Sequence, residues 1–218
     1  MLYNFLFPLA DDFGLLNLFR YLTFRTGGAI LTALVISFIL GNPLIQWLKS
    51  QQGEGQPIRE DGPESHPLTK KGTPTMGGIL ILIAVSTATL LWADISNRYV
   101  WAVLIVTLGF GSIGFVDDYL KLTKRSSNGM PGKIKLIAEV TIAGAVAWWI
   151  SEITPDPIAT GLAIPFFKNL LIDLGWFFIP FATLVVVGAS NAVNLTDGLD
   201  GLAIVPAMIV ASCLALIT

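Results

Sequence analysis

Long runs without charged residues are the feature that most constrains the fold of this chain. Six such apolar stretches occur, at residues 26–48, 77–93, 99–116, 136–150, 175–188 and 201–218, and Glu139 is the one charge inside them. A helix that crosses a bilayer needs about 20 predominantly apolar residues. Only 13% of the residues are charged, against about 25% in an average soluble domain. The chain is therefore expected to be an all-α, polytopic transmembrane helix bundle with about six spans, forming one domain over residues 1–218.

The distribution of lysine and arginine predicts which ends of these spans face the cytoplasm. The connections at about residues 49–76 and 117–135 each hold several basic residues, whereas those at 94–98 and 151–174 hold one each. Positive charge accumulates in cytoplasmic loops, so the first two connections are expected inside and the N-terminus outside. Alternation then places residues 189–200 on the cytoplasmic side as well. No basic cluster typical of nucleic-acid binding occurs, so no nucleic-acid partner is expected.

Local signals predict further details between and within the spans. The Pro- and Gly-containing stretch 154–168 predicts a turn-rich loop with a short hairpin, and residues 166–173 a short helix at the membrane interface. Pro180 and Pro206 are expected to kink their helices, a break that membrane helices tolerate. Glu139 is expected to extend its carboxylate back toward the interface.

A pair of aspartates follows the third apolar run directly. Asp117 and Asp118 lie four and three residues before Lys121, so on a continuing helix Lys121 faces both. One interpretation is a salt bridge at a helix end, although carboxylates at a helix C-terminus oppose the helix dipole. The other is functional, with the pair supplying hard oxygen ligands for Mg²⁺ or one aspartate acting as a general base.

A second polar constellation lies between the fifth and sixth apolar runs. Asn191, Asn194 and Asp197 recur every third residue, and Gly198, Leu199, Asp200 and Gly201 follow. The spacing puts the first three side chains on roughly one helical stripe, and the glycines allow a tight turn. Amides and carboxylates together can recognise a sugar, a base or a metal, whereas the alternative is a polar seam between helices.

Two basic segments could contact phosphate. Lys70 and Lys71 precede Gly-Thr-Pro-Thr75-Met-Gly-Gly before the second apolar run, and lysine charge, threonine hydroxyls and glycine amides can line an anion site. Lys133 follows the turn Gly129-Met-Pro-Gly132. For both segments the alternative is ordinary basic charge beside a membrane span.

These motifs together resemble the phospho-N-acetylmuramoyl-pentapeptide transferase family, within the polyprenyl-phosphate N-acetylhexosamine-1-phosphate transferases. The matching elements are Gly62-Pro-x-x-His66 with the segment 70–78, Gly114-Phe-Val-Asp-Asp-Tyr-x-Lys121, and the run 191–203. The resemblance implies a Mg²⁺-dependent enzyme of the bacterial cytoplasmic membrane. Such an enzyme transfers phospho-MurNAc-pentapeptide from UDP-MurNAc-pentapeptide to undecaprenyl phosphate, which yields lipid I and UMP.

The resemblance also implies roles for individual residues. Asp117 would deprotonate or position the lipid phosphate, and Asp118 would lie at the metal together with Asp197. The implied substrate contacts are Lys70, Thr75, Lys121, Lys133, Asn194, Asp197, Gly198, Leu199 and Asp200. Family members have about ten spans and tend to form homodimers, so the chain is expected to be an N-terminal part, truncated at its C-terminal side. Alternatives are a related UDP-amino-sugar-phosphate transferase, an inactive fragment that binds nucleotide, and a cation transporter.

Overall fold

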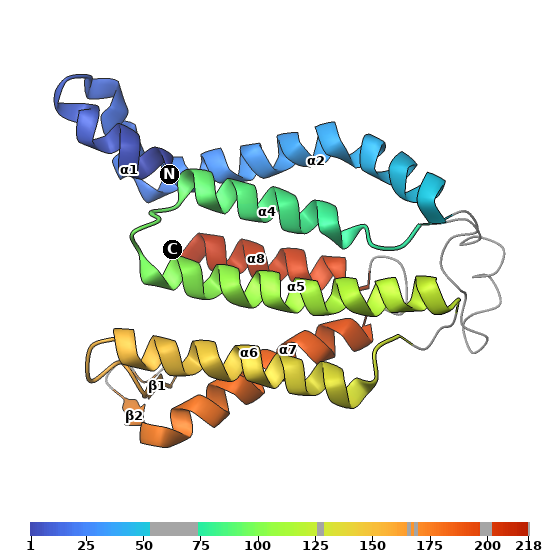
Figure 1. Ribbon diagram of the computed structural model, residues 1–218. Coiled ribbons are helices and arrows are strands. Elements are labelled where there is room, and N and C mark those ends of the chain that lie inside the picture. The colour runs from blue at the N-terminus through green and yellow to red at the C-terminus, as the bar shows by residue number, and fades with distance from the viewer. Residues whose placement is uncertain (53–73, 126–128, 165–166, 168–169, 197–201, 218) are drawn as a thin grey trace. The chain divides into compact units, whose positions relative to one another are not determined.

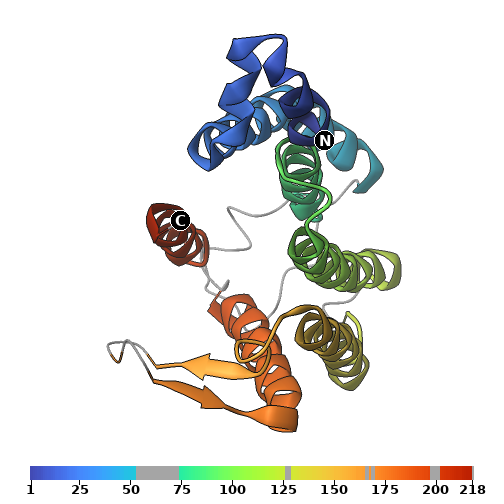
Figure 2. The ribbon, with the colours of Figure 1, turned by 90° about the vertical axis from the view of Figure 1, so that its left-hand side faces the viewer.

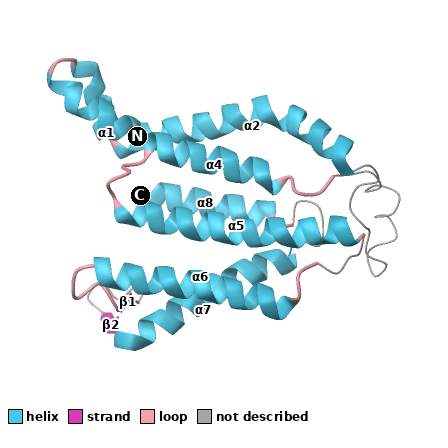
Figure 3. Ribbon diagram, viewed as in Figure 1, coloured by secondary structure: helices cyan, strands magenta, loops and turns pink. Residues whose placement is uncertain are grey.

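The computed structural model describes residues 1–52, 74–125, 129–164, 167, 170–196 and 202–217. Helices make up most of this part of the chain, and loops, turns and two three-residue strands make up the rest (Figure 3). The chain divides into two compact units, Met1–Ile142 and Ala143–Thr218, and the boundary falls within helix α6. The all-α transmembrane prediction is confirmed.

The first unit begins with a short helical segment that the sequence analysis did not assign. It consists of α1 (Leu2–Leu6) and two 3-10 helices, η1 (Phe7–Asp11) and η2 (Gly14–Arg20). Three long helices follow: α2 (Leu22–Gln52), α4 (Gly78–Trp92) and α5 (Arg98–Lys124). Helix α4 lies beside α2 on one side and α5 on the other (Figure 1). Helix α6 (Gly132–Ile153) starts in this unit.

Small residues bring these helices together. Ala84 and Ala88 of α4 and Ala102 of α5 are buried, and small side chains allow membrane helices to approach closely. Large apolar side chains such as Leu31 and Phe38 of α2 are exposed, as expected for a surface that faces lipid. An aromatic cluster of Phe19, Phe24 and Trp92 joins η2, α2 and the C-terminal end of α4.

The second unit contains the rest of α6, strands β1 (Gly161–Ala163) and β2 (Leu171–Asp173), and the 3-10 helix η3 (Gly175–Phe177). Helices α7 (Phe178–Thr196) and α8 (Ile204–Ile217) complete it. The strands pair antiparallel with Leu162 opposite Ile172, and β2 leads into α7 (Figure 2). The predicted interfacial helix at 166–173 is therefore wrong, because its last three residues form β2. The predicted hairpin begins where expected, but its second strand lies beyond residue 168.

The predicted spans correspond to six apolar helices with different lengths. Four segments of the described chain are long and apolar enough to cross a membrane: Leu22–Gln52, Arg98–Lys124, Gly132–Ile153 and Gly175–Thr196. The second and sixth predicted spans correspond to the shorter apolar helices α4 and α8.

Two local expectations are corrected. Pro206 is the third residue of α8, and Pro180 is the third residue of α7, directly after the 3-10 helix η3. A missing N–H there breaks no hydrogen bond of the α-helix, so neither proline interrupts an α-helix from within. Glu139 does not extend to the interface. It is the eighth residue of α6, in the third turn, with 3% of its surface exposed, packed within the protein.

Candidate functional site

The aspartate pair lies near the C-terminal end of α5, on the part of the helix that follows its apolar run. Helix α5 has 27 residues, and Asp117 is 117 − 98 = 19 residues beyond Arg98 at its start. At 1.5 Å per residue this separation is about 29 Å, close to the thickness of the hydrocarbon core. With Arg98 at one membrane edge, this length would place the carboxylates near the other, on helical turns that continue to Lys124.

Lys121 bridges the two carboxylates, as its spacing predicts. Its Nζ lies 2.6 Å from Oδ2 of Asp117 and 3.3 Å from Oδ1 of Asp118. The side chains retain 17% exposure for Lys121, 18% for Asp117 and 30% for Asp118. The ion pairs are thus shielded enough to be stronger than surface pairs, yet a ligand arriving from solvent can reach them.

A turn before α6 closes on Asp117. The backbone N–H of Met130 donates a hydrogen bond of 2.7 Å to Oδ1 of Asp117. Gly129 permits this approach, because a Cβ at that position would overlap the same oxygen and come within 2.9 Å of Cε of Lys121. The sequence pattern predicted only a turn leading to Lys133, and neither the hydrogen bond from Met130 to Asp117 nor the need for glycine at position 129 was predicted. A glycine in a turn beside a charged motif is the signal that could have indicated them.

Thr75 approaches Asp118 from the segment before α4. Its Oγ1 donates a hydrogen bond of 2.9 Å to Oδ2 of Asp118. The two residues are 43 apart in sequence, so the contact joins the start of the second apolar helix to the end of the third. The structure thus brings together four of the predicted site residues: Thr75, Asp117, Asp118 and Lys121.

Other predicted residues lie elsewhere or outside the described part of the chain. Lys133 is the second residue of α6 and is exposed; among the described residues, the hydrogen bonds and ion pairs of the aspartates do not include it. Asn194 lies on the last turn of α7, in the second unit, with an exposed side chain. The positions outside the described residues are Lys70, Asp197, Gly198, Leu199 and Asp200.

The net charge of the cluster suits a metal cation that also binds the phosphates of a substrate. Asp117 and Asp118 contribute two negative charges and Lys121 one positive charge, so the cluster remains negative by one. Among the described residues, no group of three or more His, Cys, Asp or Glu side chains gathers that could hold a metal ion. Two carboxylates nevertheless fit Mg²⁺, which binds through one or two carboxylates and fills its remaining positions with water and substrate phosphates.

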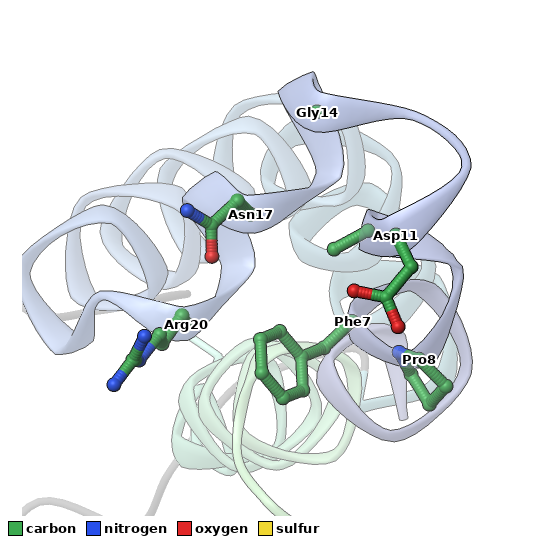
Figure 4. A pocket seen from close by; sticks show the side chains of 7 residues that line it. Phe7, Pro8, Asp11, Gly14, Asn17 and Arg20 are labelled. Atoms are coloured by element: carbon green, nitrogen blue, oxygen red, sulfur yellow. The ribbon is translucent and has the colours of Figure 1, made fainter.

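A separate cavity lies in the N-terminal segment. It has a volume of about 380 Å³ and is lined by Phe7, Pro8, Ala10, Asp11, Gly14, Asn17 and Arg20 of η1 and η2 (Figure 4). The N-terminal segment contacts the C-terminal end of α4, where Asn4 donates to Asp94 at 2.9 Å, whereas Thr75 precedes the N-terminal end of α4. This cavity is therefore at the opposite end of α4 from the aspartate pair and shares no residue with it.

Comparison with known proteins supplies a family assignment. Residues 100–218 match the family model described as glycosyl transferase family 4. Residues 70–82 match signature 1 of phospho-N-acetylmuramoyl-pentapeptide-transferase. This signature contains Thr75, and the family match contains Asp117, Asp118 and Lys121.

Two curated relatives carry the name phospho-N-acetylmuramoyl-pentapeptide-transferase. The protein from Granulibacter bethesdensis (strain ATCC BAA-1260 / CGDNIH1) is 63% identical over 217 residues, and that from Maricaulis maris (strain MCS10) is 55% identical over 222 residues. Each alignment covers 100% of this chain and 60% of the relative. The chain thus spans about 60% of the length of the curated relatives it matches. Its apolar helices agree with a multi-pass membrane protein.

Proposed function

The chain belongs to glycosyl transferase family 4, with the signature of its phospho-N-acetylmuramoyl-pentapeptide-transferases, and on that premise we propose that it serves lipid I synthesis. The protein would transfer phospho-MurNAc-pentapeptide from UDP to undecaprenyl phosphate and release UMP. The observation that supports the proposal is the cluster of Thr75, Asp117, Asp118 and Lys121, which joins the segment before α4 to the C-terminal part of α5. A lipid acceptor with a phosphate headgroup would present its reactive oxygen at the membrane edge, where we expect this cluster to lie.

The transfer exchanges one phosphoanhydride bond for another, and the phosphoester bond to the sugar stays intact. An oxygen of undecaprenyl phosphate bonds to the phosphorus that carries the sugar, and the bond from that phosphorus to the bridging oxygen breaks, so UMP leaves with that oxygen. Asp117 would accept the proton of the lipid phosphate or hold the phosphate in line. Phosphoryl transfer depends mainly on such positioning and on neutralisation of charge.

The remaining groups would neutralise and hold the phosphates. Lys121 is the described cation nearest the carboxylates, at 2.6 Å from Asp117, and the exposed Lys133 could approach a bound pyrophosphate. Mg²⁺, held by Asp118 and by Asp197 beyond the described residues, would neutralise the pyrophosphate when bound. Thr75 would keep Asp118 oriented, and Lys70, Asn194, Gly198, Leu199 and Asp200 would contact the donor.

The topology belongs to the same proposal. The site would face the cytoplasm, where UDP-linked donors are made, and the N-terminus would lie outside a bacterial inner membrane. A homodimer of the whole protein remains part of the prediction from family resemblance. A cation transporter would be expected to place its carboxylates near the middle of the bilayer, whereas Asp117 lies about 29 Å along α5 from Arg98.

The test is UMP release by the purified protein with UDP-MurNAc-pentapeptide, undecaprenyl phosphate and Mg²⁺. Asp117→Asn should lower the rate by at least about 100-fold, because the neutral amide neither accepts the proton nor pairs with Lys121. Asp12→Asn, at an exposed acid of the N-terminal segment, should leave the rate unchanged. A second UDP-amino-sugar donor distinguishes a related transferase. Equal rates for Asp117→Asn and the unsubstituted protein would refute the assigned role.

A further inference from the structure

Gln52 forms a two-point contact with the backbone of Thr75. It is the last residue of α2 and is half-buried. Its Oε1 accepts a hydrogen bond of 2.9 Å from the N–H of Thr75, and its Nε2 donates one of 3.0 Å to the C=O of Thr75. A carboxamide offers the same donor and acceptor as a peptide group. Two parallel bonds fix both the position and the orientation of the Thr75 backbone.

The backbone that Gln52 holds is unusual. Met76, the next residue, has φ of +71°, a left-handed conformation that non-glycine residues rarely adopt and that surrounding structure must sustain. The hydrogen bonds to Thr75 act directly beside this strained residue. Without them the segment before α4 would be free to relax toward ordinary dihedral angles, and the direction of the Thr75 side chain would change.

The direction of that side chain matters because its hydroxyl holds Asp118. Oγ1 of Thr75 donates to Oδ2 of Asp118 at 2.9 Å, while Oδ1 of Asp118 lies 3.3 Å from Nζ of Lys121. Gln52 is thus one step removed from the carboxylate and contacts it only through Thr75. The contacts form a continuous path from the end of α2, through the segment before α4, to the end of α5.

We propose that Gln52 is a positioning residue for transfer, which fixes the Thr75 hydroxyl on Asp118 through the Thr75 backbone. The inference rests on the proposed function for its catalytic part. It assigns to the end of α2 a role that neither the family match nor the signature at 70–82 covers. It also explains why a polar side chain at the end of a membrane helix is half-buried.

The test combines amide exchange with a double-substitution cycle on the full chain. In Gln52→Met, which keeps similar length and removes both polar groups, the Thr75 amide should exchange about five- to tenfold faster, as expected for one lost hydrogen bond. Gln51→Ala is the matched control, because Gln51 is the preceding residue of the same helix and is exposed. Its substitution should leave Thr75 exchange unchanged.

The rate of UMP release distinguishes positioning from a merely structural role. Gln52→Met should lower the rate about 10- to 100-fold, the effect of a misplaced group at a reacting centre. In a Thr75→Val background, where the hydroxyl is already absent, the same substitution should change the rate less than about twofold. Gln52→Glu, which retains the acceptor for the Thr75 N–H, should restore part of the rate.

Each result decides a different part of the inference. Additive losses in the double variant, or unchanged Thr75 exchange in Gln52→Met, would overturn the positioning role while leaving the proposed function intact. Absence of UMP release by the unsubstituted protein would overturn the proposed function and the catalytic part of this inference. The exchange measurement would still report whether Gln52 holds Thr75.

Discussion

Replacement of Gly129 by alanine tests whether the turn before α6 braces Asp117. An alanine Cβ would overlap Oδ1 of Asp117, come within 2.8 Å of its Cγ and lie 2.9 Å from Cε of Lys121. Both neighbours belong to the ion pair, so neither can move without disturbing it. The clash should displace Asp117 and break its hydrogen bond from the N–H of Met130.

The magnitude follows from two opposing terms. A hydrogen bond to a charged group contributes about 1.5–3 kcal/mol. Replacing glycine by alanine restricts the unfolded chain and returns about 0.4–1 kcal/mol. Gly129→Ala should therefore lower the free energy of unfolding by roughly 1–2 kcal/mol. It should also slow UMP release by about 10- to 100-fold through misplacement of Asp117.

Gly132→Ala provides the control from the same turn. A Cβ at Gly132 meets nothing within 4 Å, and this residue begins helix α6, where alanine is the better helix former. Thermal unfolding in detergent and UMP release should both remain at or above the values of the unsubstituted protein. If Gly129→Ala matched Gly132→Ala in both assays, the turn would not brace Asp117 and the argument would be refuted.

Two further predictions concern the opposite end of the first unit. Gly28→Ala should overlap the ring of Trp92 and destabilise the fold by about 1–3 kcal/mol, with a shift in tryptophan emission, whereas Gly27→Ala meets nothing within 4 Å and should do neither. A hydrogen bond from Ser96, opposed by burial and reinforced by other partners, lowers the pKa of Asp94 below its ordinary value of 3.8. A depressed folded-state pKa contributes stability above the unfolded value and loses it as pH falls through the folded value, so Asp94→Asn should flatten the decline in melting temperature below about pH 4. An unchanged acid limb in Asp94→Asn would contradict that assignment.

The apolar runs predict where the spans lie but not where the helices end. Hydropathy reports contact with lipid, whereas helical hydrogen bonds continue into water. Helix α5 therefore runs from Arg98 to Lys124, eight residues beyond the apolar run that ends at Val116. The polar turns past that run carry Asp117 and Lys121, so the part of the helix that hydropathy does not detect is the part that carries the candidate chemistry.

Local spacing also explains which contacts of the site were predictable. The bridge from Lys121 to both aspartates follows from separations of three and four residues on one helix. The contact of Thr75 with Asp118 and that of Met130 with Asp117 join residues 43 and 13 apart. Such contacts depend on how helices pack, which no local pattern in one sequence specifies.

The β1–β2 hairpin shows a second reason why the sequence did not predict the whole fold. Residues 166–173 end in Leu171-Ile172-Asp173, and eight residues are too few for helical and strand periodicity to be separated. Strand β2 exists because it pairs with β1, and the Thr160 hydroxyl donates to Asp173 at 2.6 Å at the end of that pairing. The partner strand, and not the segment itself, decides the conformation.

The aspartate pair is held on every oxygen, and this bears on how it could work. Asp117 accepts from Met130 and pairs with Lys121, while Asp118 accepts from Thr75 and pairs with the same lysine. Donors fixed before a substrate arrives need no reorganisation during reaction. Lys121 pairs with both carboxylates and so orients them, but its single positive charge balances only one of their two negative charges. The cluster of these three side chains therefore keeps one negative charge. A second lysine bridging the pair would orient the carboxylates equally well but remove that charge, so the single bridge at Lys121 is compatible with the proposed metal role.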